Sequence, residues 1–324
     1  LGFIVLVLLF GTKYLAILLA LLFAHLIILS PFLIRTIKYT RPNFQFLKHA
    51  SIFYFIQLFY MFFGEYAKVL QGEFLGLEAV AFLSISVVIG QMITLFGANF
   101  ANVALPIFAS AYKERNMSLL DKKFQETARI NAFFVLPIFF FLIFNSDLVL
   151  GIFGAEYKEG NLILLFILSG SFINSFVGPN GSLLLMSGNE KWELLNGVIK
   201  FIIAFSISIL LGKKFIWGIA LGLAVSDIVV NLLKVIEVYY FFRIVPFNRN
   251  VVTYLIYIIL FELALFISLK MISLDIVYIF MISILLIILS WAISFSRSPN
   301  KSDRDIYAKA LSICRDKIRL VLLR

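Results

Sequence analysis

The sequence predicts an all-α protein, a polytopic bundle of transmembrane helices, and three observations lead to this class. The 324 residues are 62% hydrophobic and only 14% charged, whereas soluble domains are about 45–50% apolar and about 25% charged. Long apolar runs, many near the ~20 residues that a membrane-spanning helix needs, follow one another along the chain. These runs lack the alternation of a transmembrane β-strand. The composition excludes a water-soluble enzyme and a disordered chain.

Ten apolar segments are expected to cross the membrane. The first lacks a basic region before it and a cleavage site after it, so it is not a signal peptide. We expect it to be the end of a helix, and the chain to be the C-terminal part of a longer protein. The expected spans are about residues 1–10 (partial), 14–34, 50–71, 77–111, 128–153, 160–187, 192–212, 215–242, 251–270 and 273–296.

Basic residues divide the loops between these spans into two sets. One alternating set, together with the C-terminal tail, holds four times as many Lys and Arg residues as the other. Because cytoplasmic loops are enriched in Lys and Arg, this split predicts a cytoplasmic C-terminus. A missed span would mix the two sets, so the split also supports the order of the spans. The net charge of +10 therefore indicates cytoplasmic loops and no nucleic-acid partner.

Two polar segments are expected to lie beside the membrane. Residues 113–130 form a basic amphipathic connector, and residues 297–324 form a basic cytoplasmic tail. Apolar residues of the tail recur at helical spacing with Lys and Arg opposite, which is typical of a helix on an anionic leaflet. A frayed, solvated tail is the alternative. The apolar positions are Ile306, Ala310, Cys314, Ile318 and Val321.

Charged side chains within the expected spans are candidate functional residues, because such groups are costly in lipid and usually face a cavity or a partner. Asp227, Asn231 and Lys234 lie at i, i+4 and i+7 of one expected helix and share a face. Lys200 lies in the preceding span. Asp227 either braces the bundle by pairing with one of the two lysines or takes part in transport.

Other ionisable residues have stronger structural alternatives. Glu65 and Lys68 are three residues apart near the outer end of a span and can pair with each other. Glu262 lies in a late span, where a structural role is favoured. Lys234 can also extend its long side chain toward the cytoplasmic surface of the membrane.

Polar residues mark the 77–111 span as well. Gln91, Thr94, Asn99 and Asn102 recur there at roughly helical spacing. They either line an aqueous cavity or hydrogen-bond to a neighbouring helix.

The run VGPNG, inside a later span, is the most informative local feature. Gly178, Pro179 and Gly181 free backbone groups in mid-membrane, which is tolerated where protein or a water-filled cavity satisfies them. Transporters have such breaks near their binding sites, so Asn174 and Asn180 are binding candidates. A kink without a functional role is the alternative.

The sequence has no enzyme or metal signature. One cysteine and two histidines cannot form a Cys/His metal site. No GxxxxGK[ST] phosphate loop and no HExxH motif occurs. We expect neither catalysis nor a cofactor, apart from a coupling proton or sodium ion.

Five stretches share their pattern, in order, with one transporter family. They are GEYAKVLQGEFLGLEAVAFLSIS (64–86), ANVALPIFASAYKERN (101–116), LVLGIFGAEYKEG (148–160), GPNGSLLLMSGNEKWELLN (178–196) and GIALGLAVSDIVVN (218–231). Over about residues 50–250, the chain thus resembles the polysaccharide-biosynthesis flippases. These are the O-antigen and repeat-unit transporters of the multidrug/oligosaccharidyl-lipid/polysaccharide superfamily. One departure is Phe82, where the family often has Tyr.

The resemblance implies one six-helix lobe of a two-lobe transporter, with two preceding and two following helices. The implied regions are the end of the first lobe (1–36), a basic cytoplasmic linker (37–49), the second lobe (50–243), two additional helices (250–296) and the tail (297–324). The family holds a lipid diphosphate with cationic cavity residues. Here these would be Lys68, Lys200 and Lys234.

The expected function is a flippase that moves an undecaprenyl-diphosphate-linked oligosaccharide, an O-antigen or capsule/exopolysaccharide repeat unit, to the outer leaflet by alternating access. Asp227 could exchange a coupling proton or sodium ion. The expected partners are membrane lipids, the lipid-linked oligosaccharide and polysaccharide polymerase machinery, with a monomer in the cell inner membrane. The alternatives are a multidrug/cation antiporter of the same superfamily, with an acidic, aromatic-lined pocket, and a non-transporting membrane subunit of polysaccharide assembly.

Overall fold

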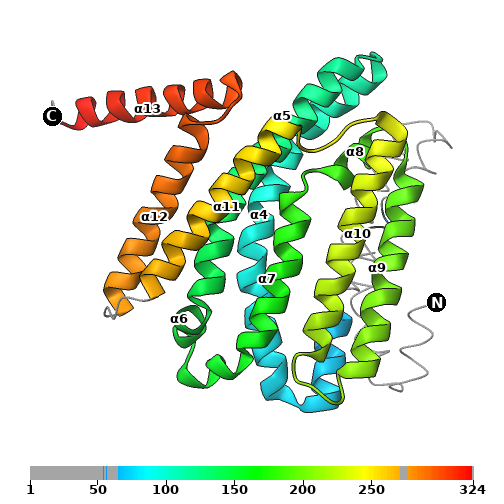
Figure 1. Cartoon of the computed structure of the whole chain (residues 1–324). Helices are drawn as coiled ribbons and strands as arrows, with labels where there is room; N and C mark the ends of the chain where they lie inside the picture. The colour runs from blue at the N-terminus through cyan, green and yellow to red at the C-terminus, as the bar shows by residue number, and fades with distance from the viewer. Residues whose placement is uncertain (1–53, 55, 57–64, 271–275, 323–324) are drawn as a thin grey trace, which may run out of the picture. The chain divides into compact units, whose positions relative to one another are not determined.

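The computed structural model describes residues 54, 56, 65–270 and 276–322 (Figure 1). These residues form helices joined by turns and contain no strand, which confirms the predicted all-α class. The chain divides into two compact units, Leu1–Tyr54 and Phe55–Arg324. Everything below concerns the second unit. The expected spans 1–10 and 14–34 and the linker 37–49 lie outside the described residues.

The described helices follow one another with short connections. Residues 65–75 are helical and end at Gly76, which has a left-handed φ of +87°. The later helices are α4 (Leu77–Lys113), α5 (Met117–Phe144), α6 (Ser146–Gly151), the 3-10 helix η1 (Ala155–Gly160), α7 (Asn161–Phe176), α8 (Asn180–Met186), α9 (Glu190–Leu211), α10 (Gly218–Phe242), α11 (Arg249–Lys270), α12 (Ile276–Ser296) and α13 (Lys301–Leu322).

Six helices among the described residues are long and apolar enough to cross a membrane. They are α4, α5, η1 with α7, α9, α10 and α11. The described part of α12 adds a shorter apolar helix, Met281–Ser296. The chain is therefore a multi-pass membrane protein, as its composition predicts.

The predicted length of the connector, residues 113–130, is wrong. Only residues 114–116 form a turn, and α5 begins at Met117. The Asn116 side chain accepts a hydrogen bond from the Leu119 N–H at 3.0 Å and so caps the first turn of the helix. The polar part of the segment thus continues without interruption into the apolar part of α5.

Two expected spans are interrupted, so their predicted limits are wrong. The span predicted at 128–153 ends at Phe144, because the Asn145 amide donates to the Phe141 carbonyl at 2.9 Å and α6 starts separately. The span predicted at 160–187 is divided into α7 and α8 around Gly178, whose φ is +88°. Only glycine adopts this backbone conformation easily.

Glycines allow the closest helix contacts in the centre of the bundle. Gly170 of α7 faces α10, where an added Cβ would lie 3.1 Å from the Ala224 Cα. Gly222 of α10 faces α9, where an added Cβ would lie 2.7 Å from the Ala204 carbonyl oxygen. Close packing through small residues is the usual way in which membrane helices associate. It holds α7, α10 and α9 together in that order, with α4 packed on α7.

The last two apolar helices attach to the bundle through α5, as Figure 1 shows. The rings of Phe133 and Phe295 meet edge-to-face with centroids 5.3 Å apart. The Trp291 indole packs on Phe134 with centroids 5.0 Å apart and donates to its carbonyl at 3.3 Å. Aromatic contacts of this kind add to the apolar area that α5, α11 and α12 bury together.

Candidate functional site

A cavity of about 610 Å³ lies among α4, α7, α8, α9 and α10. Its volume is in the usual range for small-molecule sites, about 300–1,000 Å³. Most of the residues predicted from the sequence line it. They are Lys68, Gln91, Asn174, Gly178, Pro179, Asn180, Gly181, Lys200, Asp227, Asn231 and Lys234.

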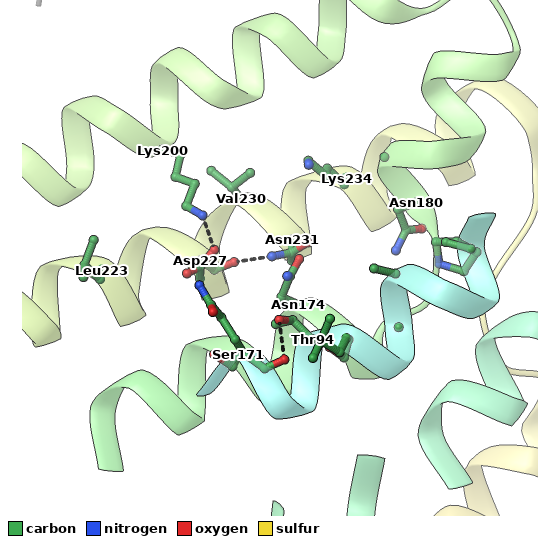
Figure 2. Close-up of a pocket in the computed structure, with 18 of the residues that line it drawn as sticks. Thr94, Ser171, Asn174, Asn180, Lys200, Leu223, Asp227, Val230, Asn231 and Lys234 are labelled. Carbon is green, nitrogen blue, oxygen red and sulfur yellow. Dashed lines mark hydrogen bonds and ion pairs between the residues drawn. The ribbon is translucent and has the colours of Figure 1, made fainter. Parts of the chain in front are cut away.

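An ion pair joins α9 to α10 in the wall of the cavity (Figure 2). The Lys200 Nζ lies 2.5 Å from the Asp227 Oδ1, and the two side chains are 15% and 22% exposed. The Asn231 amide donates to the Asp227 carbonyl at 2.8 Å, one turn further along α10. Of the two lysine partners considered for Asp227, the structure places Lys200 beside it.

A second ion pair, deeper in the protein, joins the same two helices. The Lys234 Nζ lies 2.6 Å from the Glu193 Oε1, and the two side chains are 8% and 5% exposed. The prediction that Lys234 extends to the cytoplasmic surface is therefore wrong, because this carboxylate holds its ammonium inside the bundle. Sequence reasoning missed Glu193, which looks like an acidic residue in the first turn of a helix.

The spacing of the charges contained a signal for this second pair. Glu193 and Lys200 are seven residues apart on α9, and Asp227 and Lys234 are seven residues apart on α10. On both helices the acid comes first along the chain and the lysine follows. Because consecutive helices joined by a short turn run antiparallel, this shared order brings each acid opposite a base.

The helix break brings polar groups to the second ion pair. Asn180, at the start of α8, donates from its amide to the Val177 carbonyl at 2.9 Å and thereby satisfies a backbone group that the break frees. A Cβ at Gly181 would lie 3.1 Å from the Glu193 carboxylate oxygens. The glycine thus allows the close approach of α8 to the Glu193–Lys234 pair.

The polar residues of α4 divide between two faces. Gln91 lines the cavity, and Thr94 lies one turn further on the same face and donates to the Gln91 carbonyl at 3.1 Å. Asn99 and Asn102 are exposed and are not among the lining residues. The prediction that all four residues line one cavity is therefore wrong. The lining face continues at Ala98, and Asn99 is rotated from it by about 100° around the helix.

Two other predicted acids lie outside the cavity. Glu65 forms an exposed pair with Lys68, with 3.1 Å between Oε1 and Nζ. Glu262 of α11 is fully buried, and the Ser290 hydroxyl of α12 donates to its carboxyl group. Glu262 thus bridges α11 and α12 at a distance from the cavity wall.

The lining of the cavity is rich in charged and polar groups. Three lysines and two acids line the cavity, so its formal charge is positive. Both acids are paired with lysines, and amide and hydroxyl groups surround them. Within residues 65–270 and 276–322, no three His, Cys, Asp or Glu side chains lie together in a way that could hold a metal ion.

Comparison with known proteins shows which family the chain is similar to. Residues 2–160 match the family model described as polysaccharide biosynthesis protein. This match confirms the resemblance to polysaccharide-biosynthesis proteins that the sequence predicts. A curated relative is the capsular polysaccharide biosynthesis protein CapF of Staphylococcus aureus, which is 29% identical over 157 residues, 46% of this chain and 37% of CapF. The chain thus matches well under half of the length of this polysaccharide-biosynthesis relative.

A solved structure has the same fold. The lipid II flippase MurJ, in its inward closed conformation, aligns with a TM-score of 0.56 over 67% of this chain and 46% of MurJ. The sequence identity is 18%, so the likeness concerns the fold alone. The helical arrangement of this chain is therefore similar to that of MurJ over the aligned part.

Proposed function

We propose that this chain forms the second lobe of a flippase that moves a lipid-linked oligosaccharide to the outer leaflet of the membrane. The observation that carries the proposal is the double ion pair in the wall of a 610 Å³ cavity inside an apolar bundle. Charged groups at such depth are costly and generally mark a transport pathway. The capsular role of CapF and the lipid II flippase activity of MurJ support this choice.

The cavity chemistry fits an undecaprenyl-diphosphate headgroup. Lys200 and Lys234 can each exchange a carboxylate for a phosphate oxygen, since charge-assisted hydrogen bonds to both are of similar strength. The amides of Asn174 and Asn180 offer donors and acceptors for sugar hydroxyls. An Asp227 carboxylate released from its lysine would be costly in this environment, so it would take up a proton or a sodium ion. This exchange couples transport to an ion gradient.

The cargo in this proposal is an O-antigen, capsule or exopolysaccharide repeat unit whose lipid tail stays in the bilayer. The lobe rocks against its counterpart around the cavity and exposes it alternately to the two sides. The protein works as a monomer in the cell inner membrane, with its C-terminus in the cytoplasm and polysaccharide polymerase machinery nearby. A multidrug/cation antiporter is less favoured, because a lysine already neutralises each acid of the cavity.

The test is complementation of a strain that lacks its repeat-unit flippase by the natural protein that carries this sequence. We expect the wild type to restore surface polysaccharide and Lys200→Gln and Asp227→Asn to reduce it by at least about 30-fold, because a buried charge contact contributes about 2 kcal/mol or more. Lys123→Gln removes a half-buried pair with Glu126 on α5, away from the cavity, and should have little effect.

Immunoblots of the membrane fraction separate lost transport from lost protein. Two results together would contradict the proposal. The wild type does not restore surface polysaccharide in the flippase-deletion strain, and Asp227→Asn behaves like the wild type in every transport assay. A change in drug accumulation with unchanged surface polysaccharide would support the antiporter instead.

A further inference from the structure

A buried ion pair fastens α13 to α5. The Arg129 Nε donates to the Asp303 Oδ2 at 3.1 Å, and an Arg129 terminal nitrogen donates to the Asp303 Oδ1 at 3.2 Å. The two side chains are 6% and 0% exposed. The Ser298 hydroxyl donates to the same carboxylate at 2.6 Å. A two-pronged contact of this kind fixes direction as well as distance, so α13 has a defined position on the bundle.

This ion pair lies where two membrane boundaries are expected. The sequence predicts that the span within α5 begins at residue 128 and that the span within α12 ends at residue 296. Arg129 follows the first boundary directly, and Asp303 lies shortly after the second. Figure 1 shows that α13 turns away from α12 at a steep angle. A helix that turns steeply away from a spanning helix at this level lies along the membrane surface.

The ion pair also fixes the rotation of α13 about its own axis. Asp303 is buried toward α5, and residues at i+3, i+4, i+7 and i+11 share its face. These are Ile306, Tyr307, Ala310 and Cys314, all apolar or weakly polar. Tyr307 packs on the aromatic cluster of α5, α11 and α12. We therefore expect the apolar face of α13 to turn toward the membrane.

The remaining surface of α13 is basic. Six Lys and Arg residues of the helix outnumber its three Asp residues, and Arg129 already neutralises one of these. Lys301 and Lys309 are exposed, while Ile306 on the membrane-facing side is 42% exposed and lacks full protein cover. Basic residues beside an apolar face attract anionic headgroups while the apolar residues enter the interface.

We propose that α13 binds an anionic lipid surface and that the Arg129–Asp303 pair is a clamp that sets its height and its rotation. Without the clamp, the helix would be held only by the short turn at 297–300 and by the packing of its first turns, including Tyr307, on the bundle. The clamp thus converts a tail that could be solvated into a fixed membrane-surface helix. This inference does not depend on the transported substrate.

The single cysteine of the chain allows a direct test. The chain is labelled at Cys314 with an environment-sensitive fluorophore and placed in nanodiscs of phosphatidylcholine, alone or mixed with phosphatidylglycerol. Quenching by acrylamide, a neutral solute, reports exposure to water. We expect quenching to be several-fold weaker with phosphatidylglycerol and this difference to shrink at high salt, because salt screens exposed charges.

Variants of the clamp complete the test. Arg129→Gln should raise quenching in both lipid mixtures, and the exchange Arg129→Asp with Asp303→Arg should reverse much of this rise. Lys123→Gln, which removes a half-buried pair with Glu126 nearer the start of the same helix, should leave quenching unchanged. If Arg129→Gln fails to fold, the double variant with exchanged charges and the comparison of the two lipid mixtures still test the proposal.

Two outcomes would overturn the proposal. The first is equal quenching in both lipid mixtures, with no effect of Arg129→Gln. The second is undiminished protection of Cys314 in detergent without lipid, which would indicate a protein contact instead of a lipid surface.

Discussion

At the scale of single residues, burial decides how much each ion pair contributes to stability. Glu193→Gln should lower the free energy of unfolding by about 3–5 kcal/mol, because it leaves the Lys234 ammonium beside a neutral amide in a buried site. The two side chains are only 5% and 8% exposed and lie 2.6 Å apart. The melting temperature of the purified protein in detergent, followed by intrinsic fluorescence, measures the loss.

An exposed pair provides the matched control for this substitution. Glu65→Gln removes the partner of Lys68, and the Glu65 side chain is 60% exposed. Surface ion pairs contribute about 0–1 kcal/mol, so the melting temperature should hardly change. Equal losses for Glu65→Gln and Glu193→Gln would contradict the view that burial sets the cost.

The same residues show how far the sequence predicts the site. A polar residue in an apolar run is easily recognised, so Asp227, Lys200 and Lys234 were predictable as a group. Their partners depend on the register of α9 against α10, which hydrophobic periodicity does not specify. Glu193 was missed for this reason. The seven residues from Glu193 to Lys200, which match the seven from Asp227 to Lys234 with the acid first in both helices, are the signal that could have found it.

At the scale of elements, the break between α7 and α8 should be the most sensitive turn. Gly178 has φ +88°, and an added Cβ would lie 2.8 Å from the Ala128 Cβ of α5; Gly188 has φ +76° and open space around it. Alanine at either position should lower the free energy of unfolding by about 1–2 kcal/mol, because the backbone there is left-handed. Only Gly178→Ala also brings the new Cβ into steric overlap with Ala128, which costs a further amount of about 1–3 kcal/mol.

The melting temperatures of these two variants measure the difference. Gly178→Ala should lower the melting temperature more than Gly188→Ala, since the Gly188 variant contains the backbone strain alone. Equal decreases would mean that α5 moves away freely and that the break is not held against it. The comparison therefore separates the contact between elements from the local turn.

The existence of the helices was more predictable than their ends. Apolar runs identify α4, α9, α10 and α11 within a few residues. Hydropathy averages over many positions, so it placed the start of α5 too late and its end too far along the chain. The local signals were Asn116 and Asn145, whose side chains bond to backbone groups at the two ends of the helix. An Asn can be recognised as such a capping residue only once the position of the neighbouring turn is known.

At the scale of the whole described unit, the path of the chain agrees with the charge of its turns. In Figure 1, α8, the turn at 243–248 and the elbow before α13 lie at one end of the helices, and α6 lies at the other. The first group belongs to the loops rich in Lys and Arg. Because basic loops stay in the cytoplasm, this end is predicted to be the cytoplasmic one.

Reporter fusions test this orientation. A reporter that works only in the cytoplasm should be active after Arg115 and silent after Gly154, and a reporter that works only outside should show the opposite. A second pair of fusions, after Gly188 and after Lys213, checks the same alternation around α9.

The orientation also determines the order in which a headgroup meets the two ion pairs. Glu193 and Lys234 would lie about 10 Å closer to the cytoplasm than Lys200 and Asp227, given 1.5 Å per helical residue. A headgroup entering from the cytoplasm would then meet Lys234 first, and a cytoplasmic Gly154 would contradict both the topology and this order.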